Sequence, residues 1–275
     1  MGGEDVSSAL ASASAPAIRG VGHPRLIRAA VVIGTFFVLL AIWQFYVTQI
    51  YDSPISLPTP ASTWEAFVEL MQSGELQEAT IESFTVLLVG GIPGVIIGIL
   101  AGLVIGATRP LDTAFAPYIF AFYATPFPAL IPIFILLFGL GVVGKGMIVF
   151  TLVVTTVLLQ TVAGVKSVDP RFLESSRSFG SSGRRMLFEV QLPAALSFIV
   201  AGIRLAVGRA LVGVVIAEFD TALSGLGALI FRYAGRLRLS EAFVPAIILA
   251  LTGIVASIGL RVLEKRFERW RQVGG

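Results

Sequence analysis

The sequence predicts an all-α integral membrane protein with six transmembrane helices. Hydrophobic residues make up 56% of the 275 residues and charged residues only 13%, against about 45–50% and about 25% in typical globular domains. Long charge-free apolar runs recur along the chain, and about 20 apolar residues are what a helix needs to cross the hydrocarbon core. Basic residues gather in only some of the segments between these runs, as they do in multi-pass membrane proteins.

The apolar runs give the six expected spans in order. The first, Ala29–Val47, is longer than the apolar region of a signal peptide and is followed by no small-residue cleavage site, so we expect it to be retained. The remaining runs have the length of a membrane helix or exceed it. They are Val86–Ala107, Thr113–Gly144, Gly146–Val165, Pro193–Ala217 and Ala242–Leu260.

The distribution of Lys and Arg predicts the orientation. No basic residue lies between Arg28 and Arg109. In contrast, 14 of the 20 basic residues lie in the leader up to and including Arg28, at Arg109, in the segment 166–189 and in the tail 261–271. Basic loops face the cytoplasm, so we expect both termini inside a bacterial plasma membrane and the first loop outside. Arg232, Arg236 and Arg238 depart from this pattern. We expect residues 1–24 to be a disordered leader, 25–271 the transmembrane domain and 272–275 a short tail.

Composition also excludes several functions. The net charge of +3 is too small and too dispersed for nucleic-acid binding. The chain has no cysteine, and its single His23 lies in the polar leader. We therefore expect no metal site, no thiolate chemistry and no cofactor bound by this chain.

The stretch GLGVVGKG, Gly139–Gly146, matches seven of the eight positions of the phosphate-binding P-loop pattern. Gly146 stands where that pattern needs a hydroxyl for Mg²⁺. A P-loop also requires a strand before it and a solvated α/β domain, but here both flanks are apolar runs of membrane length. We therefore predict a tight turn between two membrane helices with a snorkelling Lys145, and no ATP hydrolysis by this chain.

Glycine recurs at every fourth position of the second apolar run. Residues at this spacing share one helix face, and the missing side chains allow another backbone to approach closely. We interpret the face as a packing seam within one bundle in preference to a subunit interface. Its members are Gly90, Gly94, Gly98, Gly102 and Gly106.

The third run contains TPFPALIP, whose three prolines require a kink or a break in the helix. Irregular backbone at membrane depth occurs only inside protein or beside a wet cavity, so a translocation pathway and a dry, kinked helix both remain open. In the fifth run Arg204 lies near mid-membrane, and Glu218 lies about 21 Å beyond it, close to the same face. The candidate pathway residues are Pro126, Phe127, Arg204, Arg209 and Glu218.

The basic segment 167–192 predicts a rigid helix–turn–helix. Asp169-Pro170 is a helix start, with an acidic cap and proline at the first helical position. Gly180 is a helix stop in the left-handed conformation, Ser181-Ser182 can cap a second short helix, and Pro193 opens the fifth span. Such a segment, tied to two membrane helices, could transmit force from a soluble partner to the bundle.

This segment resembles the loop motif of the transmembrane permease subunits of binding-protein-dependent ABC importers, E-A-A-x-x-x-G, nine residues, then I-x-L-P. The chain has Glu174-Ser175-Ser176, three residues, Gly180, nine residues, Val190, Gln191 and Leu192-Pro193. Two alanines are replaced by serine and one isoleucine by valine. Further stretches, including LPTP at 57–60, FGLGVVGK at 138–145 and LEKRFERW at 263–270, resemble the nitrate/sulfonate/taurine branch.

The resemblance implies a type I ABC importer bundle without catalytic residues of its own. It implies a second permease copy, an extracytoplasmic solute-binding protein, and ATPase subunits that hold ATP and Mg. It implies that the segment 167–192 is the element that docks on the ATPase, and it favours a small anionic solute. The residues matched to this ATPase-coupling role are Glu174, Ser175, Ser176, Gly180, Arg184 and Arg185.

Two other classes of membrane protein remain to be weighed. An ion-gradient-driven secondary transporter could use the intramembrane Glu218 with Arg204, but it leaves the segment 167–192 unexplained. A membrane-embedded enzyme would need a nucleophile–base pair or a metal site, and the spans contain neither cysteine nor histidine. The sequence does not distinguish a homodimer from a heterodimer of permeases, nor does it identify the solute.

Overall fold

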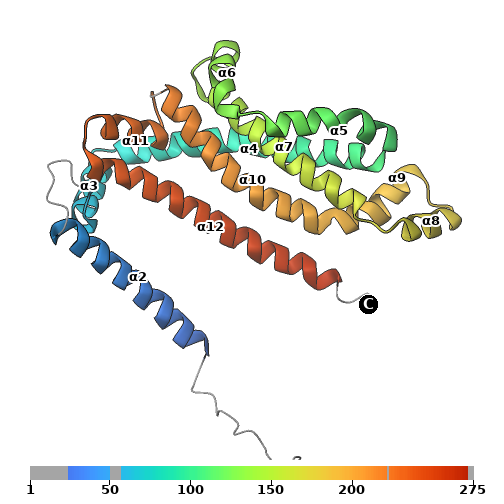
Figure 1. Ribbon diagram of the computed structural model, residues 1–275, viewed down its shortest axis with the longest axis horizontal. Coiled ribbons are helices and arrows are strands. Elements are labelled where there is room, and N and C mark those ends of the chain that lie inside the picture. Colours follow the sequence, from blue (N-terminus) through green and yellow to red (C-terminus); the bar gives the residue numbers. More distant parts are fainter. Residues whose placement is uncertain (1–23, 50–56, 222, 272–275) are drawn as a thin grey trace, which may run out of the picture. The chain divides into compact units, whose positions relative to one another are not determined.

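The computed structural model describes residues 24–49, 57–221 and 223–271 (Figure 1). The expected tail, and the expected leader apart from Pro24, lie outside these residues. The chain divides into two compact units, Met1–Asp52 and Ser53–Gly275. In the first unit the described residues form one helix, α2 (Pro24–Gln49). Its segment Ala30–Gln49 is long and apolar enough to cross a membrane, which confirms the first predicted span.

In the second unit every described regular element is helical. Four of these helices meet the length and composition of a membrane span, and α5 followed by η1 and α6 forms one further, bent candidate. In chain order the elements are α3 (Pro60–Gln72), α4 (Glu75–Ala107), α5 (Arg109–Ala124), the 3₁₀ turn η1 (Phe127–Leu130), α6 (Ile131–Phe138), α7 (Val142–Lys166), α8 (Pro170–Ser178), α9 (Gly183–Met186), the π-helical turn η2 (Leu187–Gln191), α10 (Leu192–Thr221), α11 (Leu226–Gly235) and α12 (Leu239–Arg271).

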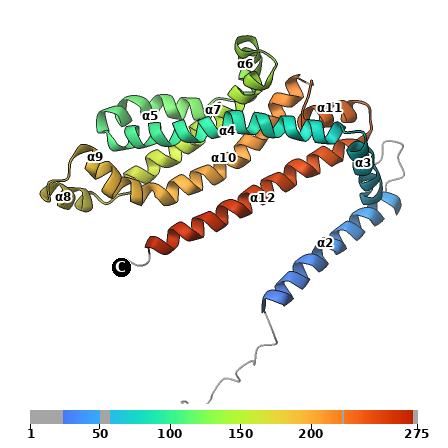
Figure 2. The ribbon, with the colours of Figure 1, turned by 180° about the vertical axis from the view of Figure 1, so that it is seen from behind.

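The centre of this unit is α7, which packs against α4 on one side and α10 on the other (Figures 1 and 2). The glycine face of α4 lies directly on α7. A Cβ built on Gly98 would lie 2.9 Å from the Cβ of Val157, and one on Gly94 would lie 2.9 Å from the Cβ of Val153. The predicted packing seam within one bundle is therefore confirmed.

Glycines also bring α7 and α10 together. A Cβ on Gly202 would lie 2.8 Å from the Cβ of Gln160, and one on Gly164 would lie 2.7 Å from the Cβ of Phe198. In a bilayer the hydrophobic effect does not drive helices together, because lipid tails are as apolar as the side chains. Close van der Waals packing of this kind therefore stabilises the bundle. The buried centre is made of small and β-branched side chains: Val86, Val149, Val153, Val157, Ala206, Ala210 and Val214.

The third predicted span is not one straight helix. Arg109–Ala124 and Phe127–Phe138 meet at an angle of 90°. The break falls at Pro126, whose ψ of 90° is extended, and Pro132 lies in the first turn of α6. The prolines thus break the helix as predicted, and the segment forms either a broken span or a re-entrant loop.

The fifth span begins earlier than predicted. Pro193 does not open it, because helical structure is continuous from Gly183 to Thr221. In the π-helical turn η2 the N–H of Leu192 donates to the C=O of Leu187, five residues earlier. One wider turn immediately before Pro193 relieves the clash that its ring would make in a regular helix. The second helix of the basic segment is therefore in line with α10.

The two ends of the second unit differ in character. The basic segment with α8 and α9 lies at one end, and α3 and α11 lie at the other (Figures 1 and 2). The second end has its own apolar cluster, to which α3, α4, α11 and α12 contribute. Its buried members include Leu70, Leu76, Leu226, Leu229 and Tyr233.

Candidate functional site

The first half of the segment 167–192 folds as predicted. The carboxylate of Asp169 accepts a hydrogen bond from the N–H of Arg171 at 2.8 Å, and Pro170 occupies the first helical position of α8. Gly180 has a φ of +83°. The N–H of Ser181 donates to the C=O of Ser176, and the N–H of Gly180 to that of Arg177. This pair of bonds is the Schellman arrangement that ends a helix.

The second half departs from the prediction in one detail. Ser182 stands at the N-cap of α9, but its side chain makes no capping hydrogen bond. The helix is held instead by its continuity with α10 and by an ion pair between Arg185 and Glu189, with N and O 2.9 Å apart. Gly183, at a φ of +50°, provides the turn into it.

The surface of this segment combines charges with exposed aromatic rings. Of the candidate coupling residues, Glu174, Ser175, Gly180, Arg184 and Arg185 are exposed, and Ser176 is half-buried. The side chains of Phe172 and Phe179 are 69% and 85% exposed. On the other side, Met186 and Gln191 are buried against the bundle.

Lys145 does not snorkel, in contrast to our prediction. Helix α7 begins at Val142, so Lys145 lies inside its first turn, and its side chain is 1% exposed. The Nζ ammonium donates to Glu82 Oε1, to the C=O of Ser224 and to Ser224 Oγ, each at 3.0 Å. The hydroxyl of Ser224 also donates to Glu82. An ammonium has three donors, and all three are satisfied inside the protein.

Glu218 is fully buried close to this group. Ser83 Oγ donates to its two oxygens at 2.7 and 2.9 Å, and the N–H of Gly227 donates to Oε2 at 2.8 Å. The N–H of Leu226 donates to Ser83 Oγ. A Cβ on Gly225 would lie 2.1 Å from Glu218 Oε1, so only glycine fits there. We call Glu82, Ser83, Lys145, Glu218 and Ser224 the buried polar cluster.

The candidate pathway residues separate into two places. Arg209 on α10 reaches the end of α5: its guanidinium lies 4.4 Å from the ring centroid of Tyr123 and donates to the Tyr123 hydroxyl at 2.6 Å. This contact adjoins the break, where Phe127 is buried edge-on to Phe122 and Pro126 is exposed. Arg204 is half-buried on α10, and Glu218 belongs to the buried polar cluster.

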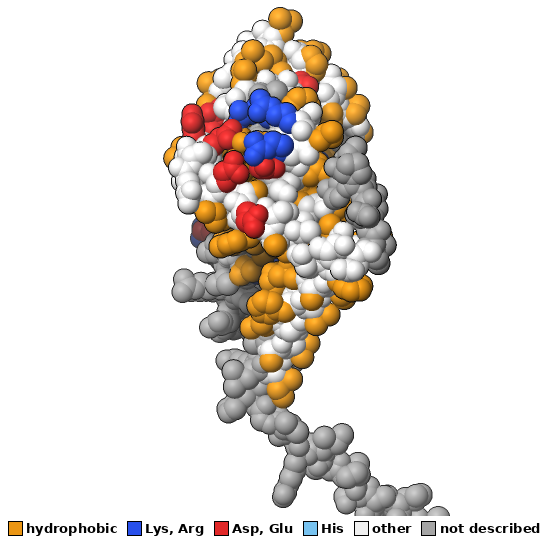
Figure 3. Space-filling view, turned by 90° about the vertical axis from the view of Figure 1, so that its left-hand side faces the viewer, with side chains coloured by type: hydrophobic (Ala, Val, Ile, Leu, Met, Phe, Trp, Pro, Cys, Tyr) orange, Lys and Arg blue, Asp and Glu red, His pale blue; other side chains and the backbone are white. Residues whose placement is uncertain are grey.

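The end formed by α3 and α11 carries a group of opposite charges (Figure 3). Arg232 pairs with Glu75 at 3.1 Å, and Arg238 pairs with Glu69 at 3.4 Å and with Glu241 at 2.5 Å. Two of the three arginines that depart from the basic-loop pattern are therefore neutralised locally. Burial, and then a hydrogen bond to Glu75, raise the pKa of the Tyr233 phenol to about 12.

Sequence reasoning identified Glu218 and Arg209 but missed their partners. Glu218 and its partner Ser83 are 135 residues apart, and Arg209 and Tyr123 are 86 apart, so no local pattern joins them. The pair of Glu82 and Lys145, 63 residues apart, was missed for the same reason. One signal was present: Lys145 stands alone between two apolar runs, and a lone ionisable residue inside membrane helices usually has a buried partner.

Three relatives resemble this chain over most of their length. It is 31% identical over 234 residues to the putative aliphatic sulfonates transport permease protein SsuC of Bacillus subtilis, covering 85% of each chain. It is 28% identical over 244 residues to the taurine transport system permease protein TauC of Escherichia coli, covering 86% of this chain and 88% of the relative. It is 30% identical to the riboflavin transport system permease protein RibX of Chloroflexus aurantiacus, with coverages of 86% and 88%.

A solved structure supports the fold. The chain superposes on a chain of the MetNI methionine ABC transporter, in inward-facing conformations, with a TM-score of 0.58 and 16% identity. The match covers 72% of this chain and 98% of that one. The family model described as binding-protein-dependent transport system inner membrane component matches residues 94–272. The chain therefore belongs to the inner membrane components of binding-protein-dependent transport systems, as a multi-pass ABC importer permease of the taurine and sulfonate branch.

Proposed function

We propose that this permease carries a small anionic solute of the taurine and sulfonate type, and that a separate ATPase drives it by docking on the segment 167–192. Family membership implies an ATPase and a solute-binding protein as partners in general terms. We assign the docking role to α8 and α9, the pathway to the surroundings of Arg209, and ATP with Mg to the partner chain. The ion-gradient-driven alternative gains no support from the relatives.

Two exposed phenylalanines, one in α8 and one at its C-cap, carry the docking proposal. Phe172 and Phe179 lie among charged and hydroxyl side chains on a short segment at one end of the bundle (Figure 2). Exposed aromatic rings surrounded by charged side chains are typical of anchors that enter a pocket on a partner. Glu174, Arg184 and Arg185 would form the charged rim of that contact.

The fold makes this segment suitable for transmitting force. Its first helix is closed by caps at both ends, and its second is continuous with α10. Met186 and Gln191 anchor it in the bundle. A displacement of α8 by a partner therefore moves α10 and, through the glycine contacts, α7.

Co-purification with the cognate ATPase tests the docking proposal. We expect Phe179→Ala to abolish ATPase recovery with the tagged permease while the protein remains folded, because most of its ring is exposed. The matched control is Val255→Ala on α12, whose side chain is 68% exposed and remote from α8. Equal ATPase recovery with both variants would contradict the assignment.

The solute class is argued from Arg209. Its guanidinium is the donor type that matches the geometry of anionic oxygen groups, and it lies next to the broken span, where Pro126 and Phe127 interrupt the helix. The hydrogen bond to Tyr123 holds it there when no solute is bound. We propose that two copies of the chain form the pathway around these residues, with Arg204 as a second cation.

Binding-protein-dependent ATPase activity in proteoliposomes tests the solute class. We expect stimulation with taurine or alkanesulfonates and not with riboflavin. Arg209→Gln should abolish stimulation while ATPase recovery stays normal, and Arg209→Lys should retain part of it. Stimulation by riboflavin alone, or full activity of Arg209→Gln, would refute the anionic solute without affecting the docking result.

Cysteine labelling tests the proposed orientation, since the chain has no native cysteine. Ser181→Cys on the α8–α9 segment should be protected from a membrane-impermeant maleimide in intact cells. Ser73→Cys, in the turn between α3 and α4, should react. The reverse pattern would place α8 outside and overturn the docking proposal.

A further inference from the structure

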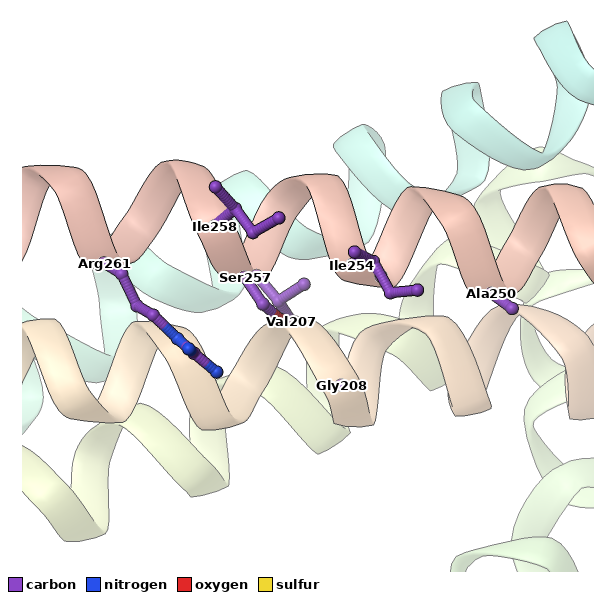
Figure 4. Close-up of a pocket in the computed structure, with 8 residues that line it drawn as sticks. Val207, Gly208, Ala250, Ile254, Ser257, Ile258 and Arg261 are labelled. Atoms are coloured by element: carbon purple, nitrogen blue, oxygen red, sulfur yellow. The ribbon is translucent and has the colours of Figure 1, made fainter. Parts of the chain in front are cut away.

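A groove between α10 and α12 lies outside every site described so far. It has a cavity volume of about 520 Å³, within the range of about 300–1,000 Å³ that is typical of ligand pockets. Small and branched residues of both helices line it (Figure 4). A Cβ built on Gly208 would meet no atom within 4 Å, so the space above this glycine is empty.

The groove has the length of one half of a bilayer. It extends along α12 from Ala250 to Arg261, eleven residues, which at about 1.5 Å per residue gives about 16 Å. The hydrocarbon core is about 30 Å thick, so each leaflet contributes about 15 Å. Ala250 therefore lies near the midplane when Arg261 lies at the membrane–water interface.

Arg261 is the charged member of the lining, and it stands at the interfacial end of the groove (Figure 4). Its side chain extends from α12 toward α10. Within the part of the chain that the structure describes, Arg261 makes no ion pair. A guanidinium binds phosphate through paired hydrogen bonds, and basic pockets between membrane helices bind anionic lipid headgroups.

We propose that this groove binds one anionic phospholipid, with an acyl chain along α10 and α12 and the phosphate on Arg261. The charge at its mouth decides against α2 as the occupant, because Pro24–Gln49 contains no carboxylate that could satisfy Arg261. A phosphodiester supplies that charge, and the apolar remainder of the groove fits the chain below it. Residues 262–271 carry four basic side chains against two glutamates, and this net positive charge favours an anionic surface.

Lipid retention by the full-length permease tests the proposal. The protein is reconstituted in nanodiscs of equal phosphatidylglycerol and phosphatidylcholine, extracted in mild detergent, and its bound lipids are counted by native mass spectrometry. We expect wild type to retain phosphatidylglycerol selectively. Arg261→Gln should lower that retention about tenfold, as expected for the loss of one charge-assisted contact, and Arg261→Lys should restore part of it.

Matched variants separate the groove from general effects. Gly208→Leu fills the groove and should displace the lipid, whereas Gly259→Leu, on α12 and also with no atom within 4 Å of its Cβ, should not. Arg109→Gln removes a basic residue elsewhere and should also have no effect. Equal phosphatidylglycerol retention by wild type, Arg261→Gln and Gly208→Leu would overturn the proposal.

Cross-linking provides the second readout. A cysteine at Ile254 in the groove, paired with one at Val38 on α2, should not form a disulfide in the membrane. Efficient cross-linking of this pair, or of Ile254→Cys to a second copy, would show that a helix occupies the groove and would also overturn the lipid assignment. Absence of both cross-links, together with selective retention, is the result we expect.

Discussion

Replacing Glu82 by glutamine should destabilise the protein far more than its position near the end of a membrane helix indicates. The substitution keeps the shape of the side chain but removes the charge that faces the ammonium of Lys145, 3.0 Å away. Lys145 has 1% of its side chain exposed, so no water can replace the lost partner. Its remaining acceptors both belong to Ser224.

The size of each loss in stability follows from the different burial of Lys145 and Glu82. Breaking a buried pair by removing one partner costs about 3–5 kcal/mol, because it leaves an uncompensated buried charge. Lys145→Met should cost less, about 1–3 kcal/mol, because Glu82 is 26% exposed and water can reach it. In the double variant no charge is left unpaired, so its loss should be smaller than the sum of the two single losses, with a coupling of about 0.5–3 kcal/mol.

Thermal unfolding in detergent, followed by tryptophan fluorescence, measures these differences. For a chain of this size 1 kcal/mol lowers the Tm by about 2–4 °C, so Glu82→Gln should lower it by roughly 6–20 °C. The control is Glu78→Gln, one turn earlier on α4 and exposed, which should leave the Tm unchanged. Equal Tm values for Glu82→Gln and Glu78→Gln, or strictly additive losses in the double variant, would refute the reasoning.

Three further predictions concern the backbone and the charged end. Gly98→Ala should destabilise by about 1–3 kcal/mol through overpacking, because its Cβ would lie 2.9 Å from that of Val157. Gly91→Ala should stabilise the protein slightly, because a Cβ there would meet no atom within 4 Å. The Tm of each variant measures the effect, and equal Tm shifts would contradict the assignment of Gly98 to the packing seam. Gly180 has a φ of +83°, and a Cβ there would meet no atom within 4 Å, so Gly180→Ala should destabilise the protein by about 1–2 kcal/mol through backbone strain alone. We expect faster proteolysis within residues 167–192, and an unchanged cleavage rate would contradict this. The Tyr233 phenol, whose pKa is raised to about 12 by burial and then by its hydrogen bond to Glu75, should titrate above the other tyrosines. Because the folded pKa exceeds the unfolded value of about 10, stability present below about pH 10 should be lost as pH rises toward 12. Absorbance difference titrations of wild type and Tyr233→Phe check this, and identical curves would disprove it.

Much of the fold was predictable because membrane helices are defined by local composition. The runs of apolar residues gave the existence of the spans, and the four-residue glycine spacing gave the face of α4 that packs on α7. Asp169, Pro170 and Gly180 gave the bounds of α8, because caps and stops depend on residues that are adjacent in the chain. The predicted ends of a helix were wrong where the helix continues beyond its apolar run, as α4 does toward Glu75.

The parts that could not be predicted depend on contacts between distant residues. Lys145 was expected to snorkel because an isolated lysine at a helix end usually reaches the interface, and only the fold shows that Glu82 and Ser224 surround it. Pro193 was expected to begin a helix, since proline prefers the first turn; the π-helical turn η2 is a tertiary accommodation with no local signature. For the same reason the contact between Arg209 and Tyr123 was invisible in the sequence.

The seam between α4 and α7 also limits which parts of the protein can move. Each of the five glycines of the seam, at every fourth position of α4 from Gly90 to Gly106, packs against one branched side chain of α7. A slide smaller than one helical turn, about 5.4 Å, would drive a methyl group into a peptide backbone. These two helices must therefore travel as a single block during any cycle of opening and closing. Any hinge has to lie outside this pair, and the 90° bend between Arg109–Ala124 and Phe127–Phe138 is one break in the helices that does so.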